Sequence, residues 1–96
     1  MRLRFSPRAR NDISYIYQYI APHNKEAATA VVRQIQFTSQ LLARYPGLGR
    51  ETDIPDVRMF PAARYPYLVY YRVIGGEVVI IHVRDGRRDS PEDKEF

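Results

Sequence analysis

Two adjacent glycines, Gly75 and Gly76, separate two runs rich in Val, Ile and Tyr near the end of this chain. A two-residue turn between antiparallel strands needs positive φ angles, which glycine adopts with little steric cost. Segment 66–89 therefore predicts a β-hairpin. Planar guanidinium groups suit bidentate contacts with phosphate or carboxylate, and three of them follow the second run: Arg84, Arg87 and Arg88. We expect the function to lie at or near this edge of the hairpin.

The beginning of the chain predicts a short strand followed by a helix. Leu3 and Phe5 alternate with arginines, a pattern typical of an edge strand with one solvated face. Ser6 followed by Pro7 predicts the start of a helix, because serine caps free N–H groups and proline has none to satisfy. Pro22 predicts the end of this helix.

A second helix and a further strand are expected before the hairpin. Asn24 is a good N-cap, and apolar residues at helical spacing follow it for about five turns. The turn-forming segment 45–49 ends this helix and opens an irregular connector that reaches about residue 56. Segment 57–60 then returns to an extended pattern. Because the link between the helices is short, they are expected to pack as an antiparallel pair.

The predicted order of elements is β-α-α-β-β-β. It indicates an α+β fold in which a helical hairpin packs on one face of a mostly antiparallel sheet. A length of 96 residues allows one domain, so residues 1–96 are expected to form it. Residues 90–96 are acidic and are expected to be a mobile tail.

A plain two-residue turn also predicts which side chains share a face of the hairpin. In that register Arg72 lies opposite Val79, and Tyr70 lies opposite Ile81 further along. One face is nearly all apolar and is expected to pack on the helices: Leu68, Tyr70, Ile74, Val79, Ile81 and Val83. The other face is mixed and is expected to be open: Tyr67, Val69, Tyr71, Val73, Val78, Ile80, His82 and Arg84. A β-bulge would exchange these assignments.

The expected open face carries an apolar patch made of Val69, Tyr71, Val73, Val78 and Ile80. A monomer rarely exposes such a patch without a partner. We therefore expect a protein partner to dock there, although a C-terminal segment that folds back would cover the patch equally well.

Composition narrows the classes of function. Thirteen of the fifteen basic residues are arginines, and eight residues are tyrosines. This combination is typical of protein interfaces and also of RNA-binding surfaces, and composition does not separate the two. The chain has no cysteine and two distant histidines, so we expect neither a metal site nor a cofactor. It also has no apolar run that predicts a membrane span or a signal peptide, which favours a cytoplasmic protein.

Two residues of the second hairpin strand are candidates for catalysis. His82 and Arg84 alternate on one strand face, with Tyr67 and Tyr71 expected across the ladder. An acid or base beside a phosphate-binding group would suit RNA cleavage by attack of a ribose 2′ oxygen. In the structural alternative, His82 is a half-buried strand residue and Arg84 is a solvated charge at the strand end.

The element order and five short motifs resemble the ParE/RelE superfamily of toxins from type II toxin–antitoxin systems. The motifs are YIA at 19–21, YPGLGR at 45–50, VRMF at 57–60, PYLVYYRV at 66–73 and HVRDGRRD at 82–89. The resemblance covers nearly the whole chain. The strand that ends in GRRD is similar to the ParE branch, whose members poison DNA gyrase. The RelE branch instead cuts mRNA in the ribosomal A site without a metal.

The resemblance implies a cognate antitoxin whose C-terminal segment wraps across the helices and the sheet. It assigns antitoxin binding to the outer sides of the helices and to the apolar patch: Val69, Tyr71, Val73, Val78 and Ile80. It assigns contacts with the target to four arginines: Arg58, Arg84, Arg87 and Arg88.

RelE-like nucleases carry basic residues at two places on the open sheet face and a functional Tyr or His in the tail. Here Tyr67 stands near the first place, only Arg84 or Arg87 is available for the second, and the tail ends at Phe96. The resemblance therefore implies a non-enzymatic inhibitor of gyrase. A ribosome-dependent mRNA endonuclease is the alternative, and a member that keeps only partner binding is a third interpretation.

Overall fold

The computed structural model describes residues 1–64 and 66–87, and its helices begin at the predicted caps. Helix α1 (Pro7–Ile20) starts at the N-cap Ser6, whose side chain accepts a hydrogen bond from the Ala9 N–H. Helix α2 (Lys25–Arg44) starts at Asn24, which caps the Ala27 N–H in the same way. Capping of this kind satisfies N–H groups that have no partner inside the helix.

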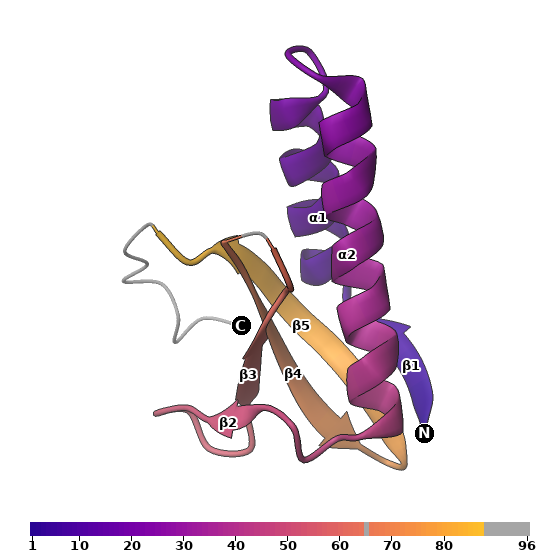
Figure 1. Ribbon diagram of the computed structural model, residues 1–96. Coiled ribbons are helices and arrows are strands. Elements are labelled where there is room, and N and C mark those ends of the chain that lie inside the picture. The colour runs from indigo at the N-terminus through magenta and orange to yellow at the C-terminus, as the bar shows by residue number, and fades with distance from the viewer. Residues whose placement is uncertain (65, 88–96) are drawn as a thin grey trace.

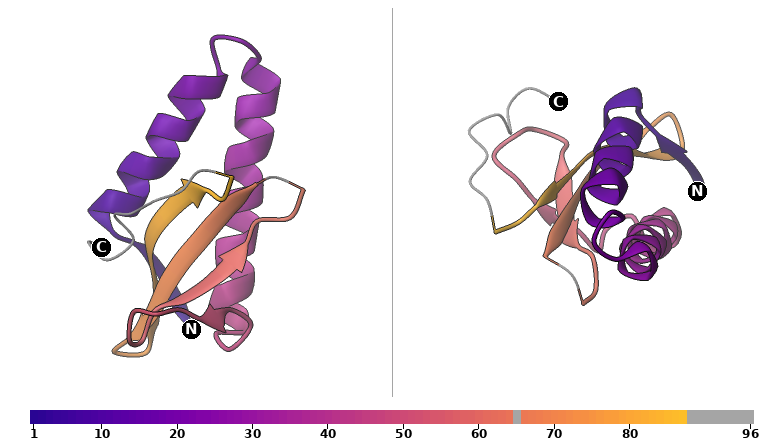
Figure 2. Two further views of the ribbon diagram at one scale, coloured as in Figure 1. Left: turned by 90° about the vertical axis from the view of Figure 1, so that its left-hand side faces the viewer. Right: turned by 90° about the horizontal axis from the view of Figure 1, so that it is seen from above.

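One five-stranded sheet completes the fold (Figure 1). Its strands are β1 (Arg2–Phe5), β2 (Arg50–Glu51), β3 (Arg58–Pro61), β4 (Tyr67–Ile74) and β5 (Glu77–Asp85). They lie in the order β1-β5-β4-β3-β2, with β1 parallel to β5 and all other neighbours antiparallel. Both helices lie on one face of this sheet (Figure 2). The α+β prediction is confirmed, with the two-residue strand β2 added inside the segment expected to be a connector.

The hairpin register starts as predicted and then shifts. Arg72 lies opposite Val79, but between Tyr71 and Tyr70 the pairing moves by one residue, so that Tyr70 lies opposite His82. Ile81 is therefore the extra residue of a β-bulge in β5. The prediction that Tyr70 lies opposite Ile81 is wrong for this reason.

In β4, and in β5 as far as the bulge, the face that packs on the helices is the one predicted to be open. Val83, beyond the bulge, packs on the helices as predicted. Beneath the helices the core includes these hairpin residues: Tyr67, Val69, Tyr71, Val78, Ile80 and Val83. Four of the five residues predicted to bind an antitoxin have no exposed surface: Val69, Tyr71, Val78 and Ile80. Val73 alone among the five is exposed, at 45%. The prediction of an open apolar patch at these positions is wrong, because the chain's own helices cover it.

The other face of the sheet is covered as well. Tyr70, Val79 and Ile81 pack there with Val57 and Met59 in a second cluster. Ile54, from the segment between β2 and β3, packs against the same cluster. Because both faces are apolar and both are covered, comparing their composition could not show which one receives the helices.

Tyr71 joins the turn after α2 to the centre of the sheet. Its phenolic oxygen accepts a hydrogen bond from the Gly49 N–H at 2.8 Å and donates one to the Pro46 carbonyl at 2.6 Å. A Cβ at Gly49 would lie 2.5 Å from this oxygen, so the close approach requires glycine. Burial raises the pKa of the Tyr71 phenol, and the hydrogen bond from Gly49 and the charge of Arg58 partly offset this rise.

We expect Tyr71→Phe to lower the free energy of unfolding by about 1 to 3 kcal/mol, because two backbone groups near Gly49 lose their partner. Urea denaturation of the purified variant measures this loss. Tyr45→Phe, at a site that is 55% exposed, is the matched control and should leave stability unchanged. Equal stability of Tyr71→Phe and the parent chain would contradict the role of this hydroxyl.

Stability should also depend on alkaline pH through Tyr71. The pKa of this phenol is raised in the folded state, so the folded chain retains the proton at a pH where the unfolded chain has lost it. The resulting stability is present below the usual phenol pKa of about 10 and is lost as pH rises through the folded value. The stability difference between the parent chain and Tyr71→Phe should therefore narrow above about pH 10. Parallel pH profiles for the two proteins would be inconsistent with this shift.

Candidate functional site

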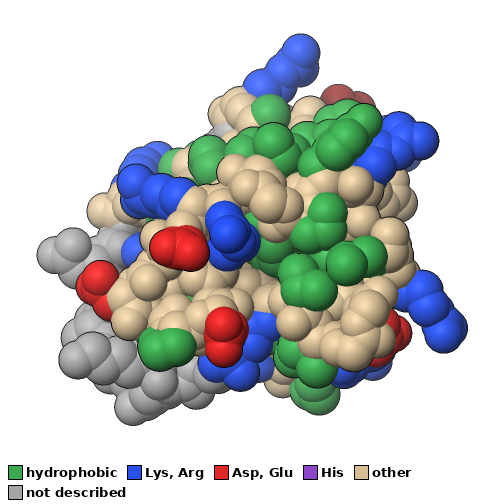
Figure 3. Space-filling view, turned by 90° about the horizontal axis from the view of Figure 1, so that it is seen from below, with side chains coloured by type: hydrophobic (Ala, Val, Ile, Leu, Met, Phe, Trp, Pro, Cys, Tyr) green, Lys and Arg blue, Asp and Glu red, His purple; other side chains and the backbone are tan. Residues whose placement is uncertain are grey.

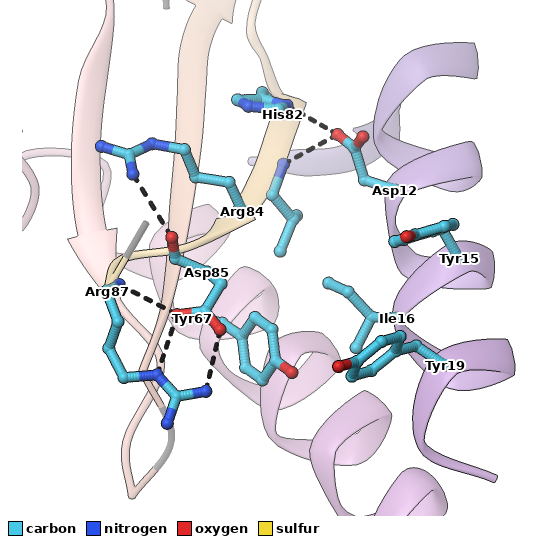
Figure 4. Close-up of a pocket in the computed structure, with 10 residues that line it drawn as sticks. Asp12, Tyr15, Ile16, Tyr19, Tyr67, His82, Arg84, Asp85 and Arg87 are labelled. Carbon is cyan, nitrogen blue, oxygen red and sulfur yellow. Dashed lines mark hydrogen bonds and ion pairs between the residues drawn. The ribbon is translucent and has the colours of Figure 1, made fainter. Parts of the chain in front are cut away.

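A hollow of about 360 Å³ lies between α1 and the C-terminal end of β5 (Figure 4). Side chains of α1 form one wall, and the ends of the two hairpin strands form the other. The lining residues are Asp12, Tyr15, Ile16, Tyr19, Tyr67, His82, Val83, Arg84, Asp85 and Arg87. Three residues that the sequence singles out, His82, Arg84 and Arg87, thus come together here.

The hollow exists where β1 stops covering the edge of β5. β1 ends opposite Ile80, and the Ser6 N–H donates to the Ile80 carbonyl at 2.9 Å. Beyond Ile80, a side chain of α1 replaces β1 as the hydrogen-bond partner of β5. Asp12 Oδ2 accepts a hydrogen bond from the Val83 N–H at 3.0 Å. Capping satisfies backbone groups at the edge of β5 that no strand pairs with.

Asp12 also holds His82. The Nδ1 of His82 lies 2.7 Å from Asp12 Oδ2, so the ring donates to the carboxylate. The two side chains are 7% and 21% exposed. Sequence reasoning missed Asp12, because it lies off the apolar stripe of α1 and 70 residues from its partner. A partly buried carboxylate that binds both a ring and a backbone N–H links α1 to β5.

Tyr70 separates the two catalytic candidates. Its ring lies 5.6 Å from the His82 ring and 5.7 Å from the Arg84 guanidinium carbon, measured to ring centroids. Arg84 Nε donates to the Tyr70 hydroxyl at 3.1 Å, and the guanidinium points away from α1 (Figure 4). The prediction that Tyr67 and Tyr71 lie across the ladder from these residues is wrong, because the bulge at Ile81 exchanges the partners.

Arg87 lies at the rim of the hollow and is paired with Asp85. Arg87 Nη2 lies 2.9 Å from Asp85 Oδ2, and the Arg87 backbone N–H donates to Oδ1 of the same carboxylate at 2.9 Å. The hydrogen bond and the charge of Asp85 raise the pKa of the guanidinium. The Arg87 side chain is still 73% exposed, so its remaining donors face solvent.

The other two predicted target contacts do not join this group. Arg58 lines a different hollow, where its Nη1 donates to the Gly49 carbonyl at 2.6 Å. Its Nη2 lies 3.9 Å from Glu51 Oε1, a surface contact of little energetic weight. Arg88 lies outside the described residues.

Tyrosines give the hollow an aromatic wall that the sequence reasoning did not identify as part of a site. Tyr15 and Tyr19 are one helical turn apart on α1, 65% and 58% exposed, and their rings stack at 6.4 Å. Tyr67, which the sequence placed on an open face, is buried, and its phenol points toward Tyr19 (Figure 4). The spacing of Tyr15 and Tyr19 was the available signal. The wall and the cation at the rim suit contacts with a protein or a nucleic acid.

Within residues 1–64 and 66–87, no group of three or more His, Cys, Asp or Glu side chains is placed to hold a metal ion. No helix in the same part of the chain is long and apolar enough to cross a membrane.

The fold is the one found in two solved toxin–antitoxin systems. The E. coli RelBE toxin–antitoxin complex superposes with a TM-score of 0.68 at 19% identity, over 91% of this chain and 98% of that one, a likeness of fold alone. The chromosomal ParDE system of P. aeruginosa superposes with a TM-score of 0.79 at 27% identity, over 88% and 95% of the chains.

Sequence comparison narrows the class to one family. Residues 3–90 match the family model of the ParE toxin of the type II toxin–antitoxin system parDE. The Y4kP protein of Sinorhizobium fredii is 33% identical over 91 residues, which cover 95% of this chain and 94% of that one. Toxin ParE3 of Caulobacter vibrioides is 32% identical over 79 residues, which cover 79% and 77%. The chain belongs to the ParE toxin family of type II toxin–antitoxin systems.

We expect Asp12→Ala to destabilise the chain by about 1 to 3 kcal/mol, because the Val83 N–H and His82 lose their acceptor. Amide hydrogen exchange at Val83 should accelerate beyond what the global loss explains. Asp53→Ala, on an exposed loop, is the matched control for removal of a carboxylate. Unchanged exchange at Val83 would show that Asp12 does not cap this edge.

Proposed function

We propose that this ParE-family toxin inhibits DNA gyrase by binding it, and that a cognate antitoxin relieves the inhibition by occupying the toxin surface. The match to the ParE toxin model over residues 3–90 carries this proposal. The site geometry supports a binding role, because the one histidine of the hollow is 6% exposed and is held by a carboxylate. A group enclosed in this way is poorly placed to exchange protons with a ribose hydroxyl.

The rim of the hollow is the proposed contact with gyrase. Arg87 is exposed there and lies across the hollow from Tyr15 and Tyr19, which are exposed as well. Arg and Tyr dominate the residues that contribute most to binding in protein interfaces. Arg84 lines the same hollow and is a further proposed contact. Arg58, which lines a different hollow, and Arg88, which lies outside the described residues, remain proposed contacts with the target.

The antitoxin is proposed to bind the outer sides of the helices. The buried hairpin residues are not accessible to it, whereas Tyr15 and Tyr19 on α1 and Phe37 on α2 are more than half exposed. Tyr15 and Tyr19 stack on each other, and exposed hydrophobic side chains that lie together are typical of a surface that binds a partner. The solved ParDE and RelBE systems are toxin–antitoxin assemblies with the same fold, which supports a partner of this kind.

A supercoiling assay tests the proposed target. Purified toxin is titrated into gyrase, ATP and relaxed plasmid, and supercoiling is expected to be lost. Arg87→Ala should raise the half-inhibitory concentration roughly tenfold, the effect expected for loss of an important interface residue. Arg33→Ala, an exposed arginine of α2, is the matched control and should inhibit like the parent chain. Full supercoiling at high toxin concentration would overturn the proposal.

Primer extension on translated messages tests the enzymatic alternative. A gyrase inhibitor should leave these messages intact. Codon-phased cuts that Arg84→Ala abolishes would instead identify a ribosome-dependent mRNA endonuclease. Expression without growth arrest would favour the third interpretation, a member that keeps only partner binding.

A further inference from the structure

The hollow between α1 and β5 joins buried apolar side chains to exposed aromatic rings. Ile16 and Val83 line it and are 8% and 2% exposed, and Tyr67 beside them is 8% exposed. Tyr15 and Tyr19 form its open side. Its volume of about 360 Å³ is at the lower end of the range of about 300 to 1,000 Å³ in which proteins hold ligands. The hollow therefore suits one apolar or aromatic group.

The carboxylates of the hollow are already bound to other groups of the chain. Asp12 Oδ2 contacts the His82 ring and accepts a hydrogen bond from the Val83 N–H. Asp85 Oδ1 accepts from the backbone N–H and the Nε of Arg87, and Oδ2 accepts from Nη2. The side chains of Asp12 and Asp85 are 21% and 16% exposed, against 73% for Arg87. An incoming group therefore meets positive charge first, which favours an acidic occupant.

Hydrophobic side chains also gather at another end of the molecule, which is seen from below in Figure 3. The exposed hydrophobic residues of the chain start, the end of α2 and the hairpin turn are Met1, Tyr45, Leu48, Val73 and Ile74. No arginine paired like Arg87 accompanies them, so charge does not identify an occupant for this second patch.

An acidic segment with one aromatic residue follows Arg87 directly along the chain. Residues 88–96 lie outside the described part of the structure, and their sequence is RDSPEDKEF. It contains four acidic residues, two basic residues and Phe96. The segment thus supplies both kinds of group that the hollow suits.

The point of attachment brings this segment close to the hollow. Arg87 itself lines the rim, and the nine residues after it span at most about 30 Å when extended. Ser90 followed by Pro91 favours a turn, which leaves five residues for a return toward the rim. A group on a short tether has an effective concentration in the millimolar range, so weak contacts are enough to hold it in place.

We propose that segment 88–96 folds back over this hollow, with Phe96 packed against the tyrosines and its carboxylates facing Arg87. This docking replaces the sequence-based expectation of a mobile tail. A consequence for activity rests on the proposed function: the docked segment covers the rim that is proposed to contact gyrase, so it competes with the target.

A nitroxide on the segment tests the docking in the full chain. The sequence contains no cysteine, so Lys94→Cys provides a single labelling site and leaves Phe96 and all four acidic residues in place. In the isotope-labelled protein, the nitroxide should broaden the backbone amide signals of Tyr15 and Tyr19. The signal of Tyr45, at the far end of α2, should stay sharp (Figure 1).

Variants of the labelled chain distinguish a docked segment from a mobile one. Phe96→Ser should lose most of the broadening at Tyr15 and Tyr19, because the apolar contact is removed. Ser90→Ala, in the same segment, is the matched control and should retain it. Equal broadening in the parent, Phe96→Ser and Ser90→Ala chains is the result of a mobile tether and would overturn the proposal, as would no broadening at all.

A mixture of two preparations tests whether the contact lies within one molecule. One preparation carries only the isotope label and the other carries only the nitroxide. Docking within one molecule predicts sharp signals at Tyr15 and Tyr19 in this mixture. Broadening there would overturn the proposal, because it would identify a second copy of the chain as the owner of the segment.

The supercoiling assay tests the competition separately from the docking. If the segment covers the rim for half to nine-tenths of the time, Phe96→Ser without the label should lower the half-inhibitory concentration about two- to tenfold. An unchanged value together with a docked segment would overturn the competition alone. A parent chain that does not inhibit gyrase would contradict the proposed function, and the nitroxide measurement would still decide the docking.

Discussion

The extra residue Ile81 in β5 determines how the hairpin meets its surroundings. Strand side chains alternate with a period of two, so one inserted residue exchanges the faces of everything that follows. Before the bulge, Val78 and Ile80 face the helices, and after it Val83 does. His82 joins Tyr70 instead, on the side of the second apolar cluster.

The bulge also explains how α1 can hold the far end of β5. β1 pairs with β5 only as far as Ile80. There the Ser6 N–H donates to the Ile80 carbonyl, and the chain changes from strand to helix. Asp12 then caps the Val83 N–H and binds His82, so a carboxylate takes the place of a strand.

Signals that act over a few residues predicted most of the fold. Ser6, Pro7 and Asn24 marked the helix starts, and Gly75 with Gly76 marked the hairpin, because caps and tight turns depend on local backbone chemistry. The bulge has no such signal, since no residue type is required at Ile81. Which apolar face receives the helices is decided by long-range packing, which sequence periodicity does not record.

The site was predictable only in part. The position of the site at the end of β5 was predicted from the arginines in and after this strand, because the sequence itself shows guanidinium groups at a strand end. Asp12 could not be found, since a polar residue off the apolar stripe of a helix is normally solvated. Its role follows from the ending of β1 and the bulge, and both are features of the assembled sheet.

Cross-strand nuclear Overhauser effects between the backbone protons of β4 and β5 test the bulge most directly. The account predicts contacts from Tyr70 to His82 and from Leu68 to Arg84, with Ile81 lacking a partner. Contacts from Tyr70 to Ile81 and from Leu68 to Val83 would contradict it, because they would establish a regular hairpin and return His82 and Arg84 to the face of Tyr71.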